Sequence, residues 1–397
     1  MEKKIEAINV TEAMKSLAWN RLLLKYIGIW PLEISYIHFL LYFFYLFLHN
    51  LLSIIELRNG KNDFEANMEF FTENVLHLMV LTKVLMCWLN RESLGRLLAE
   101  VQNNFNVDKY NTFEKRFIFM KYSRLAKYYF LVALTTMICT TVTYYIHALL
   151  PNVQMVIKNS SLSYKPPYKT ETIVDIYDIR IYVCLCIYQV LLVPTIILGY
   201  VGFDCLFANL AFHITAQFGI LSCMLREILD DSKTFQCNIR ELVLRHYKLI
   251  RQAKSLEDNY NVIILQQLMG STFQLCASGY NTLLGSVNSQ ALTVMVFNFY
   301  AMNTLSTLIT YCYIGECLIQ ESLSLSNAIY RYEWYNVSPM NLKMINICLM
   351  RMKRPEQLTS GYRQLKNGVV RSPLFFILVF NDFLHVANEE ILTINFR

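Results

Sequence analysis

Few residues of this chain have the types and spacing that chemistry requires, and the best candidates are ionisable residues inside one apolar stretch. Glu73 and His77 are four residues apart, so on a helix they share a face and are able to pair. An ionisable group inside a membrane span is a functional candidate by default, although solvation near the end of a span explains the same pair equally well. Lys83 lies about 10 Å from the other end at 1.5 Å per residue, so we expect its amine to extend to the membrane surface.

Catalytic and metal-binding patterns are not found in the sequence. It contains no phosphate-binding loop, no zinc motif and no clustered pair of acids. Cys184 and Cys186 are separated by one residue, which on a helix directs them to different faces and argues against a metal site. We therefore expect neither an enzyme nor a bound cofactor.

The elements that position these residues are predicted to be membrane spans. Of 397 residues, 55% are hydrophobic and only 17% are charged. A span needs about 20 apolar residues, and stretches of that length without Asp, Glu, Lys or Arg occupy residues 34–55, 128–151, 181–203 and 259–315. The last stretch is long enough for two spans joined by a turn near residues 285–290. A weaker span at 68–89 brings the predicted number to six, in an all-α membrane protein.

The end of the chain leaves two interpretations open. Its apolar part, residues 372–387, is short for a span and contains Asp382, which is costly in a membrane. These residues form either a short, tilted seventh helix or a divergent tail that does not cross.

Lysine and arginine predict the orientation. The loops on the side of the N-terminus contain 28 of these residues, whereas the loops on the opposite side contain 7. Cytoplasmic loops are enriched in Lys and Arg, so the N-terminus is expected in the cytoplasm. Among the glycosylation sequons at Asn9, Asn159 and Asn336, only Asn159 then lies outside the cell.

The helix of the sixth span is expected to continue into the cytoplasm. Beyond Gly315, apolar residues such as Leu318, Leu325 and Ile329 recur at helical spacing, and residues 222–260 have a similar pattern. These faces predict a packed layer beneath the membrane, which we favour over a helix lying on lipid headgroups.

Four segments of the chain, in this order, resemble segments of insect odorant receptors. They are NRLLLKYIGIWP (20–31), DCLFANLAFHITAQFGIL (204–221), RHYKLIRQAKSLEDNYNVIILQQLMGSTFQLCASGY (245–280), and YCYIGECLIQESLSLSNAIYRYEWY (311–335) followed by RMKRPEQLTSG (351–361). The resemblance covers residues 20–361 and fails after Gly361.

The resemblance implies a seven-helix subunit that assembles, as a tetramer, with a shared odorant receptor co-receptor. The complex would be a non-selective cation channel in the plasma membrane of a sensory neuron, gated by small volatile ligands. Its organisation would be a cytoplasmic segment (1–30), six helices with cytoplasmic extensions (31–361) and a divergent tail (362–397). The co-receptor would contact the later helices, for which the matching positions are Trp334, Pro355, Leu358, Thr359 and Gly361.

The resemblance also implies a ligand pocket in the outer half of the helix bundle. Aromatic residues with a few hydrogen-bonding groups suit a small volatile ligand, although for any single position ordinary helix packing is the favoured explanation. The candidates by span direction are Phe71, Val75, His77, Ile138, Thr141, Tyr144, Tyr145, Tyr182, Gln189, Phe297, Tyr300 and Thr304.

Two other functions fit a chain of this kind. A gustatory-receptor-like channel would have the same architecture without needing the co-receptor. A multi-pass transporter is less favoured, because the sequence has no internal repeat and Pro194 has no counterpart in the other half.

Overall fold

The computed structural model describes residues 10–59, 64–103, 112–157, 179–230, 235–287, 290–331 and 350–359, together with Tyr168, Lys343 and Asn346. These parts of the chain contain eight α-helices: α1 (Val10–Ile27), α2 (Tyr36–Asn59), α3 (Phe64–Leu89), α4 (Arg91–Gln102), α5 (Phe113–Ile157), α6 (Ile179–Asp230), α7 (Phe235–Val287) and α8 (Ala291–Arg331). The predicted tail (362–397) and the candidates Asn159, Trp334 and Gly361 lie outside the described residues.

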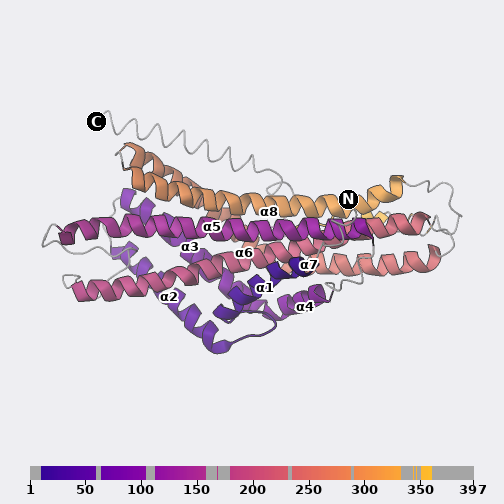
Figure 1. Cartoon of the computed structure of the whole chain (residues 1–397), viewed down its shortest axis with the longest axis horizontal. Helices are drawn as coiled ribbons and strands as arrows, with labels where there is room; N and C mark the ends of the chain where they lie inside the picture. The colour runs from indigo at the N-terminus through magenta and orange to yellow at the C-terminus, as the bar shows by residue number, and fades with distance from the viewer. Residues whose placement is uncertain are drawn as a thin grey trace.

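Four long helices run along the molecule. In Figure 1, α5, α6, α7 and α8 extend along the horizontal axis, while α2 and α3 lie toward the left and α4 toward the right. We call the left end, where α2 ends and α3 begins, the Tyr168 end, because the Tyr168 ring contacts His49 of α2 and His77 of α3. The opposite end is called the α4 end. The centre of the bundle is α6, which is buried from residue 199 to 223 except at Asn209.

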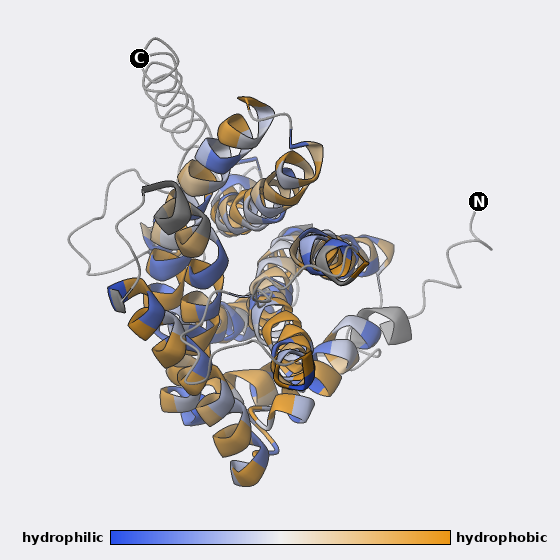
Figure 2. Ribbon diagram, turned by 90° about the vertical axis from the view of Figure 1, so that its left-hand side faces the viewer, coloured by the Kyte–Doolittle hydropathy of each residue, from blue (hydrophilic) through white to orange (hydrophobic). Residues whose placement is uncertain are grey.

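The described helices have the lengths and surfaces of membrane spans. Five of them, α2, α3, α5, α6 and α8, are long and apolar enough to cross a membrane. Hydrophobic residues also lie on their outward faces (Figure 2): Ile37, Leu41 and Phe44 of α2 are each at least 65% exposed. Such a surface suits lipid rather than water.

The predicted pair of spans in residues 259–315 corresponds to α7 and α8. Helix α7 ends at Val287 and α8 begins at Ala291, and the amide of Gln290 donates to the Gly285 carbonyl at 2.8 Å, which confirms the expected turn. The span predicted within α7 is more polar than the other five, because buried amides such as Gln267 and Gln274 replace apolar residues.

The helix of the sixth span continues well beyond Gly315, as predicted. Helix α8 is unbroken from Ala291 to Arg331, and Leu318, Leu325 and Ile329 are at most 2% exposed. On α7, Leu242, Leu249 and Leu256 are similarly buried. These faces therefore pack within the protein, and the alternative of a helix lying on lipid headgroups is wrong.

The N-terminal segment includes a helix that the sequence interpretation did not predict. Helix α1 ends at a turn in which Gly28 has a φ of +84°, a conformation that favours glycine. The amide of Ile29 donates to the Leu24 carbonyl at 2.9 Å, which is typical of a helix C-terminal cap. The turn leaves α1 against α6, where Ser16 donates to Asn209 at 2.9 Å.

Candidate functional site

A cluster of aromatic rings fills the bundle near the Tyr168 end, and Tyr168 lies at its centre. Tyr168 is 5% exposed, and its ring stacks on that of Tyr144 with centroids 4.9 Å apart and planes at 22°. The Tyr168 ring is also nearly perpendicular to the rings of His77 and Tyr145, with centroid distances of 5.1 and 6.0 Å. The cluster joins residues from α3 and α5 to one residue between α5 and α6.

The side chain of Gln189 on α6 holds the backbone of Tyr168. The Tyr168 amide donates to Gln189 Oε1 at 2.9 Å, and Gln189 Nε2 donates to the Tyr168 carbonyl at 3.0 Å. The Tyr145 hydroxyl donates to the Gln189 backbone carbonyl at 2.8 Å. This pairing satisfies the fully buried amide of Gln189 and places the Tyr168 ring among the helices.

Helix α8 and the start of α3 complete the cluster. The Tyr300 ring meets that of Tyr144 edge-on at 6.4 Å, and Phe297 lies 6.3 Å from Tyr300. Glu73, only 4% exposed, accepts a hydrogen bond from the Tyr144 hydroxyl. The arrangement combines large apolar faces with a small number of polar groups, which is the character of a small-molecule site.

The side chains of Glu73 and His77, which the spacing allowed to pair, do not pair with each other. The ring of His77 contacts the backbone of Glu73 rather than its carboxylate, and it packs against the ring of His49 with centroids 4.8 Å apart. Tyr144, from another helix, takes the position beside Glu73 that the i,i+4 spacing suggested for His77. Helical spacing allowed the pair, but it carries no information on what other helices place there.

Comparisons with known proteins agree with this architecture. The sequence model of the 7tm Odorant receptor family matches residues 63–365, which is most of the chain. The chain belongs to the odorant receptor family. Odorant receptor 10a of Drosophila melanogaster is 23% identical over 165 residues, 39% of this chain and 40% of that protein. Odorant receptor 47a of the same species is 26% identical over 220 residues, 53% of this chain and 56% of that protein. The chain thus matches about half, or less, of the length of these relatives.

Two solved structures are similar to this chain over nearly its whole length. The olfactory receptor OR5 from Machilis hrabei matches with a TM-score of 0.76 and 16% identity, covering 97% of this chain and 99% of that chain. The same receptor in complex with eugenol matches with a TM-score of 0.75 and 17% identity, covering 96% and 100%. The protein is therefore a multi-pass membrane protein with the all-α fold of odorant receptors, and as a member of that family it is not an enzyme.

The structure places the predicted ligand residues of this odorant receptor family member in two groups. The first group lies in the cluster around Tyr168: His77, Tyr144, Tyr145, Gln189, Phe297 and Tyr300. The second group has other surroundings: Phe71, Val75, Ile138, Thr141, Tyr182 and Thr304.

Contacts of the second group explain its separation. Phe71 meets Phe273 edge-on at 5.7 Å, and the hydroxyl of Tyr182 accepts a hydrogen bond from Asn152 at 3.0 Å. Thr141 and Thr304 donate to carbonyls of their own helices, at 2.8 and 2.9 Å. Val75 is half-buried, and Ile138 is 45% exposed on the surface of α5.

Sequence reasoning missed His49 and Tyr168. His49 is fully buried on α2, a helix for which no ligand residue was predicted. Its signal was the polar dipeptide His49-Asn50 in an otherwise apolar stretch. Tyr168 had no signal, because a residue between two helices has no periodicity that predicts its direction.

The expectation that Lys83 extends to the membrane surface is wrong. Its side chain is fully buried, and its amine forms an ion pair of 2.6 Å with Asp204 of α6. Tyr311 of α8 donates to the same carboxylate oxygen at 2.9 Å, and the amine lies 4.3 Å from the centroid of the Tyr200 ring. An anion from another helix stabilises the charge locally, which removes the need to reach water.

At the α4 end, the predicted partner residues contact this chain's own helices. Pro355, Leu358 and Thr359 are half-buried. Thr359 donates to Glu257 of α7, and the backbone amide of Glu356 donates to Ser322 of α8 at 3.2 Å.

The segment that contains these residues also influences a buried histidine. Burial, with a smaller contribution from the charge of Arg351, lowers the pKa of His246 on α7 to about 4. The short segment 350–359 is thus part of the packed layer formed by α7 and α8.

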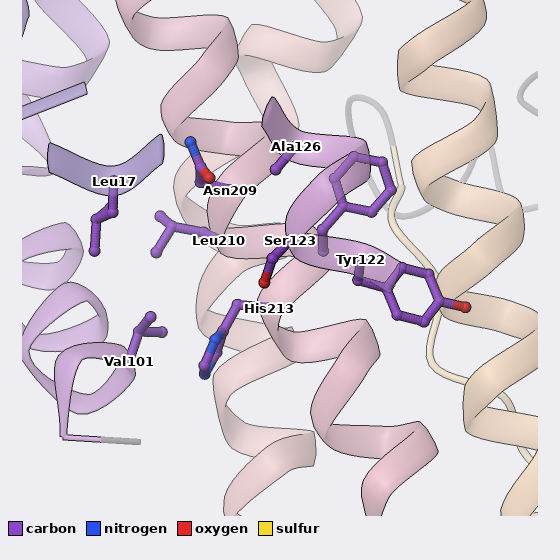
Figure 3. A pocket seen from close by; sticks show the side chains of 9 residues that line it. Leu17, Val101, Tyr122, Ser123, Ala126, Asn209, Leu210 and His213 are labelled. Carbon is purple, nitrogen blue, oxygen red and sulfur yellow. The ribbon is translucent and has the colours of Figure 1, made fainter. Parts of the chain in front are cut away.

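A small pocket at the α4 end is separate from the aromatic cluster. It is a shallow recess between α1, α4, α5 and α6. In Figure 3, Asn209 and His213 of α6 lie on one side and Leu17 and Val101 on the other. None of the predicted ligand residues lines it.

Proposed function

We propose that this chain is the ligand-binding subunit of an odour-gated, non-selective cation channel. The observation that supports this function is the buried aromatic cluster around Tyr168 in a member of the odorant receptor family. A similar fold, that of OR5 from Machilis hrabei, has been solved in complex with eugenol, a small molecule. A small volatile ligand would gate the channel from this cluster.

The ligand would bind between the helices that surround Tyr168. Tyr144, Tyr145, Phe297 and Tyr300 supply aromatic surface, which stabilises a small apolar molecule by burial and by ring contacts. His77 and Gln189 supply polar groups. Because α3, α5, α6 and α8 each contribute a residue, a ligand held here would bias their relative positions, as gating requires.

The co-receptor would bind at the α4 end, through segment 350–359 and the neighbouring parts of α7 and α8. Trp334, Pro355, Leu358, Thr359 and Gly361 are the proposed contact positions. In the same proposal the N-terminus is cytoplasmic, the complex lies in the plasma membrane, and Asn159 is glycosylated outside the cell. The organisation is a cytoplasmic segment (1–30), six helices (31–361) and a tail (362–397).

The proposal is tested by recording currents from cells that express the chain with an odorant receptor co-receptor. We expect a panel of small volatile compounds to include agonists that open a cation conductance, and we expect no response when either subunit is expressed alone. Currents from this chain without the co-receptor would favour a gustatory-like channel instead. Uptake of a ligand without current would favour a transporter.

One pair of variants connects the current to the cluster. Tyr144→Leu removes the ring that stacks on Tyr168, so we expect the agonist concentration at half-maximal response to rise about tenfold. Ile138→Leu, six residues earlier on α5 and 45% exposed, serves as the control and is expected to leave the response unchanged. Equal effects of both variants would contradict the proposed site.

A further inference from the structure

Two histidines beside Tyr168 have hydrogen-bonding groups that the protein itself does not use. His49 of α2 is fully buried and His77 of α3 is 2% exposed. Their ring centroids are 4.8 Å apart. Neither ring nitrogen of His49 has a hydrogen-bond partner, and at least one nitrogen of His77 is likewise unpartnered, since the contact of that ring is with the backbone of Glu73. A buried polar group without a partner costs the full desolvation of that group, so such groups are rare and require an explanation.

The surroundings of the two rings are mostly aromatic, and the hydrogen bond they supply is between the backbone of Glu73 and the ring of His77. The ring of Tyr168 lies 5.7 Å from His49 and 5.1 Å from His77, nearly perpendicular to both. Tyr188 of α6 adds a third polar group, because its hydroxyl is also buried without a partner and its ring lies 6.4 Å from His49. Three unused polar groups therefore lie together next to the residue at the centre of the proposed ligand site.

The chemistry of imidazole limits which ligand groups can form hydrogen bonds with these unpartnered nitrogens. A buried imidazole that contacts no carboxylate is neutral and offers one N–H donor and one nitrogen acceptor. A hydroxyl group donates to one ring and accepts from the other at the same time. An ether or carbonyl oxygen only accepts, and a hydrocarbon does neither.

The separation of the rings fits a single oxygen atom between them. Two hydrogen bonds of about 2.8 Å that meet at one oxygen hold their nitrogen atoms about 4.6 Å apart. The centroids of the two rings are 4.8 Å apart, which is close enough for one oxygen atom to reach a nitrogen of each ring when both nitrogens face the same side. A metal ion is a poorer match, because the described residues contain no group of three or more metal-binding side chains.

We infer that the ligands of this receptor belong to the small volatile alcohols and phenols, whose hydroxyl group bridges His49 and His77. The inference rests on the proposed function and adds the chemical class of the ligand. The hydrocarbon part of the ligand would lie against the rings of Tyr168 and Tyr144. A water molecule at the same position would be replaced by a group that reproduces its hydrogen bonds, which favours binding of a hydroxyl over its isosteres.

The test compares ligands that differ only in the polar group. Cells expressing the full chain with the co-receptor receive phenol, anisole or toluene, and hexan-1-ol or its methyl ether, with current as the readout. We expect the hydroxyl compounds to act at concentrations at least tenfold lower than their methyl ethers. Equal potency of phenol, anisole and toluene would overturn the inference.

Variants connect that preference to the two rings. His49→Phe and His77→Phe replace the ring without its nitrogens, so we expect the preference for hydroxyl compounds to fall at least tenfold while the response to toluene is retained. His49→Gln keeps a donor and an acceptor and is expected to retain part of the preference. His38→Phe, an exposed position on the same helix α2, is the matched control. Surface labelling in each case identifies variants that fail to reach the membrane.

The outcomes separate this inference from the proposed function. A receptor that responds only to esters, amines or hydrocarbons would keep the proposed function and overturn the hydroxyl class. If the His77→Phe variant reaches the cell surface at the normal level and still prefers hydroxyl compounds, the inference is also overturned. Absence of any current with a broad panel, despite both subunits at the surface, would instead contradict the proposed function.

Discussion

Lys83 and Asp204 bring opposite charges into the interior of the bundle. Their ion pair is 2.6 Å long and at most 1% exposed, and the Tyr311 hydroxyl donates to the same carboxylate. A buried pair gains stability only if both charges are paired and hydrogen-bonded, and it then joins the elements that hold them in one arrangement. Here those elements are α3, α6 and α8.

Removing one charge is expected to be far more costly than removing both. Lys83→Met or Asp204→Asn leaves the other group without its partner, which lowers the free energy of unfolding by about 3–5 kcal/mol. The double variant Lys83→Met with Asp204→Leu is expected to recover most of that loss. The measurement is the thermal unfolding of purified protein in detergent.

An exposed ion pair provides the control for that experiment. Arg251 pairs with Glu100 at 2.9 Å, and its side chain is 64% exposed. We expect Arg251→Met to cost less than about 1 kcal/mol, because water screens such pairs. A loss for Lys83→Met no larger than this would mean that the buried pair does not stabilise the bundle.

Single residues were the least predictable level of the structure. The sequence identified Lys83 and His77 as unusual, since ionisable groups are rare in apolar stretches. It did not identify their surroundings. Asp204 is 121 residues away from Lys83, and His49 is 28 positions before His77, so no local spacing connects either pair. The polar part of the candidate site depends on these distant contacts.

Helices, in contrast, were largely predictable, because absence of charge over about 20 residues is a strong signal for a span. The helices that contain the predicted spans are α2, α3, α5, α6, α7 and α8. Their extensions into the packed layer followed from apolar spacing in α7 and α8. Helix α1 was not predicted, because its 18 residues mix polar and apolar types without a long uncharged stretch.

Close packing between helices depends on single glycines, and Gly199 of α6 is a clear case. A Cβ atom added there would overlap the Tyr42 hydroxyl and lie 2.5 Å from Val80 Cγ1. The Tyr42 hydroxyl donates to the Thr195 carbonyl at 2.7 Å, so it cannot move without losing that bond. We expect Gly199→Ala to separate α6 from α2 and α3 and to cost about 1–3 kcal/mol in thermal unfolding.

Gly285 of α7 is the matched control, since an added Cβ atom would lie 3.2 Å from Thr293 Cγ2, a contact that a small shift relieves. We expect Gly285→Ala to change stability by less than Gly199→Ala. The opposite order would show that the contact between α6 and α2 has room for a methyl group.

At the scale of the whole molecule, the two ends have different chemistry. The Tyr168 end buries aromatic rings with few polar groups, while the α4 end contains partly exposed ion pairs such as Lys115 with Glu227 and Arg251 with Glu100. Lys and Arg are concentrated in the loops on the side of the α4 end, which predicts that this end faces the cytoplasm. Ligand and partner would then meet the protein on opposite sides of the membrane.

This orientation predicts which sequon receives a glycan. Asn159 would lie outside the cell, whereas Asn9 and Asn336 would lie in the cytoplasm, beyond the reach of glycosylation. We expect Asn159→Gln to increase the mobility of the protein on a denaturing gel as much as enzymatic deglycosylation does. Asn9→Gln and Asn336→Gln are the controls and are expected to leave the mobility unchanged. A glycan on Asn9 would contradict the orientation and, with it, the side from which the ligand enters.

Tags at the two termini extend the same experiment to the tail. An N-terminal tag is expected to bind antibody only after the cells are permeabilised, because the N-terminus is proposed to be cytoplasmic. A C-terminal tag that binds antibody on intact cells would mean that residues 372–387 cross the membrane despite Asp382. A C-terminal tag reached only after permeabilisation would mean that this tail does not cross, and the cation pathway of the complex would then have to be lined by the co-receptor.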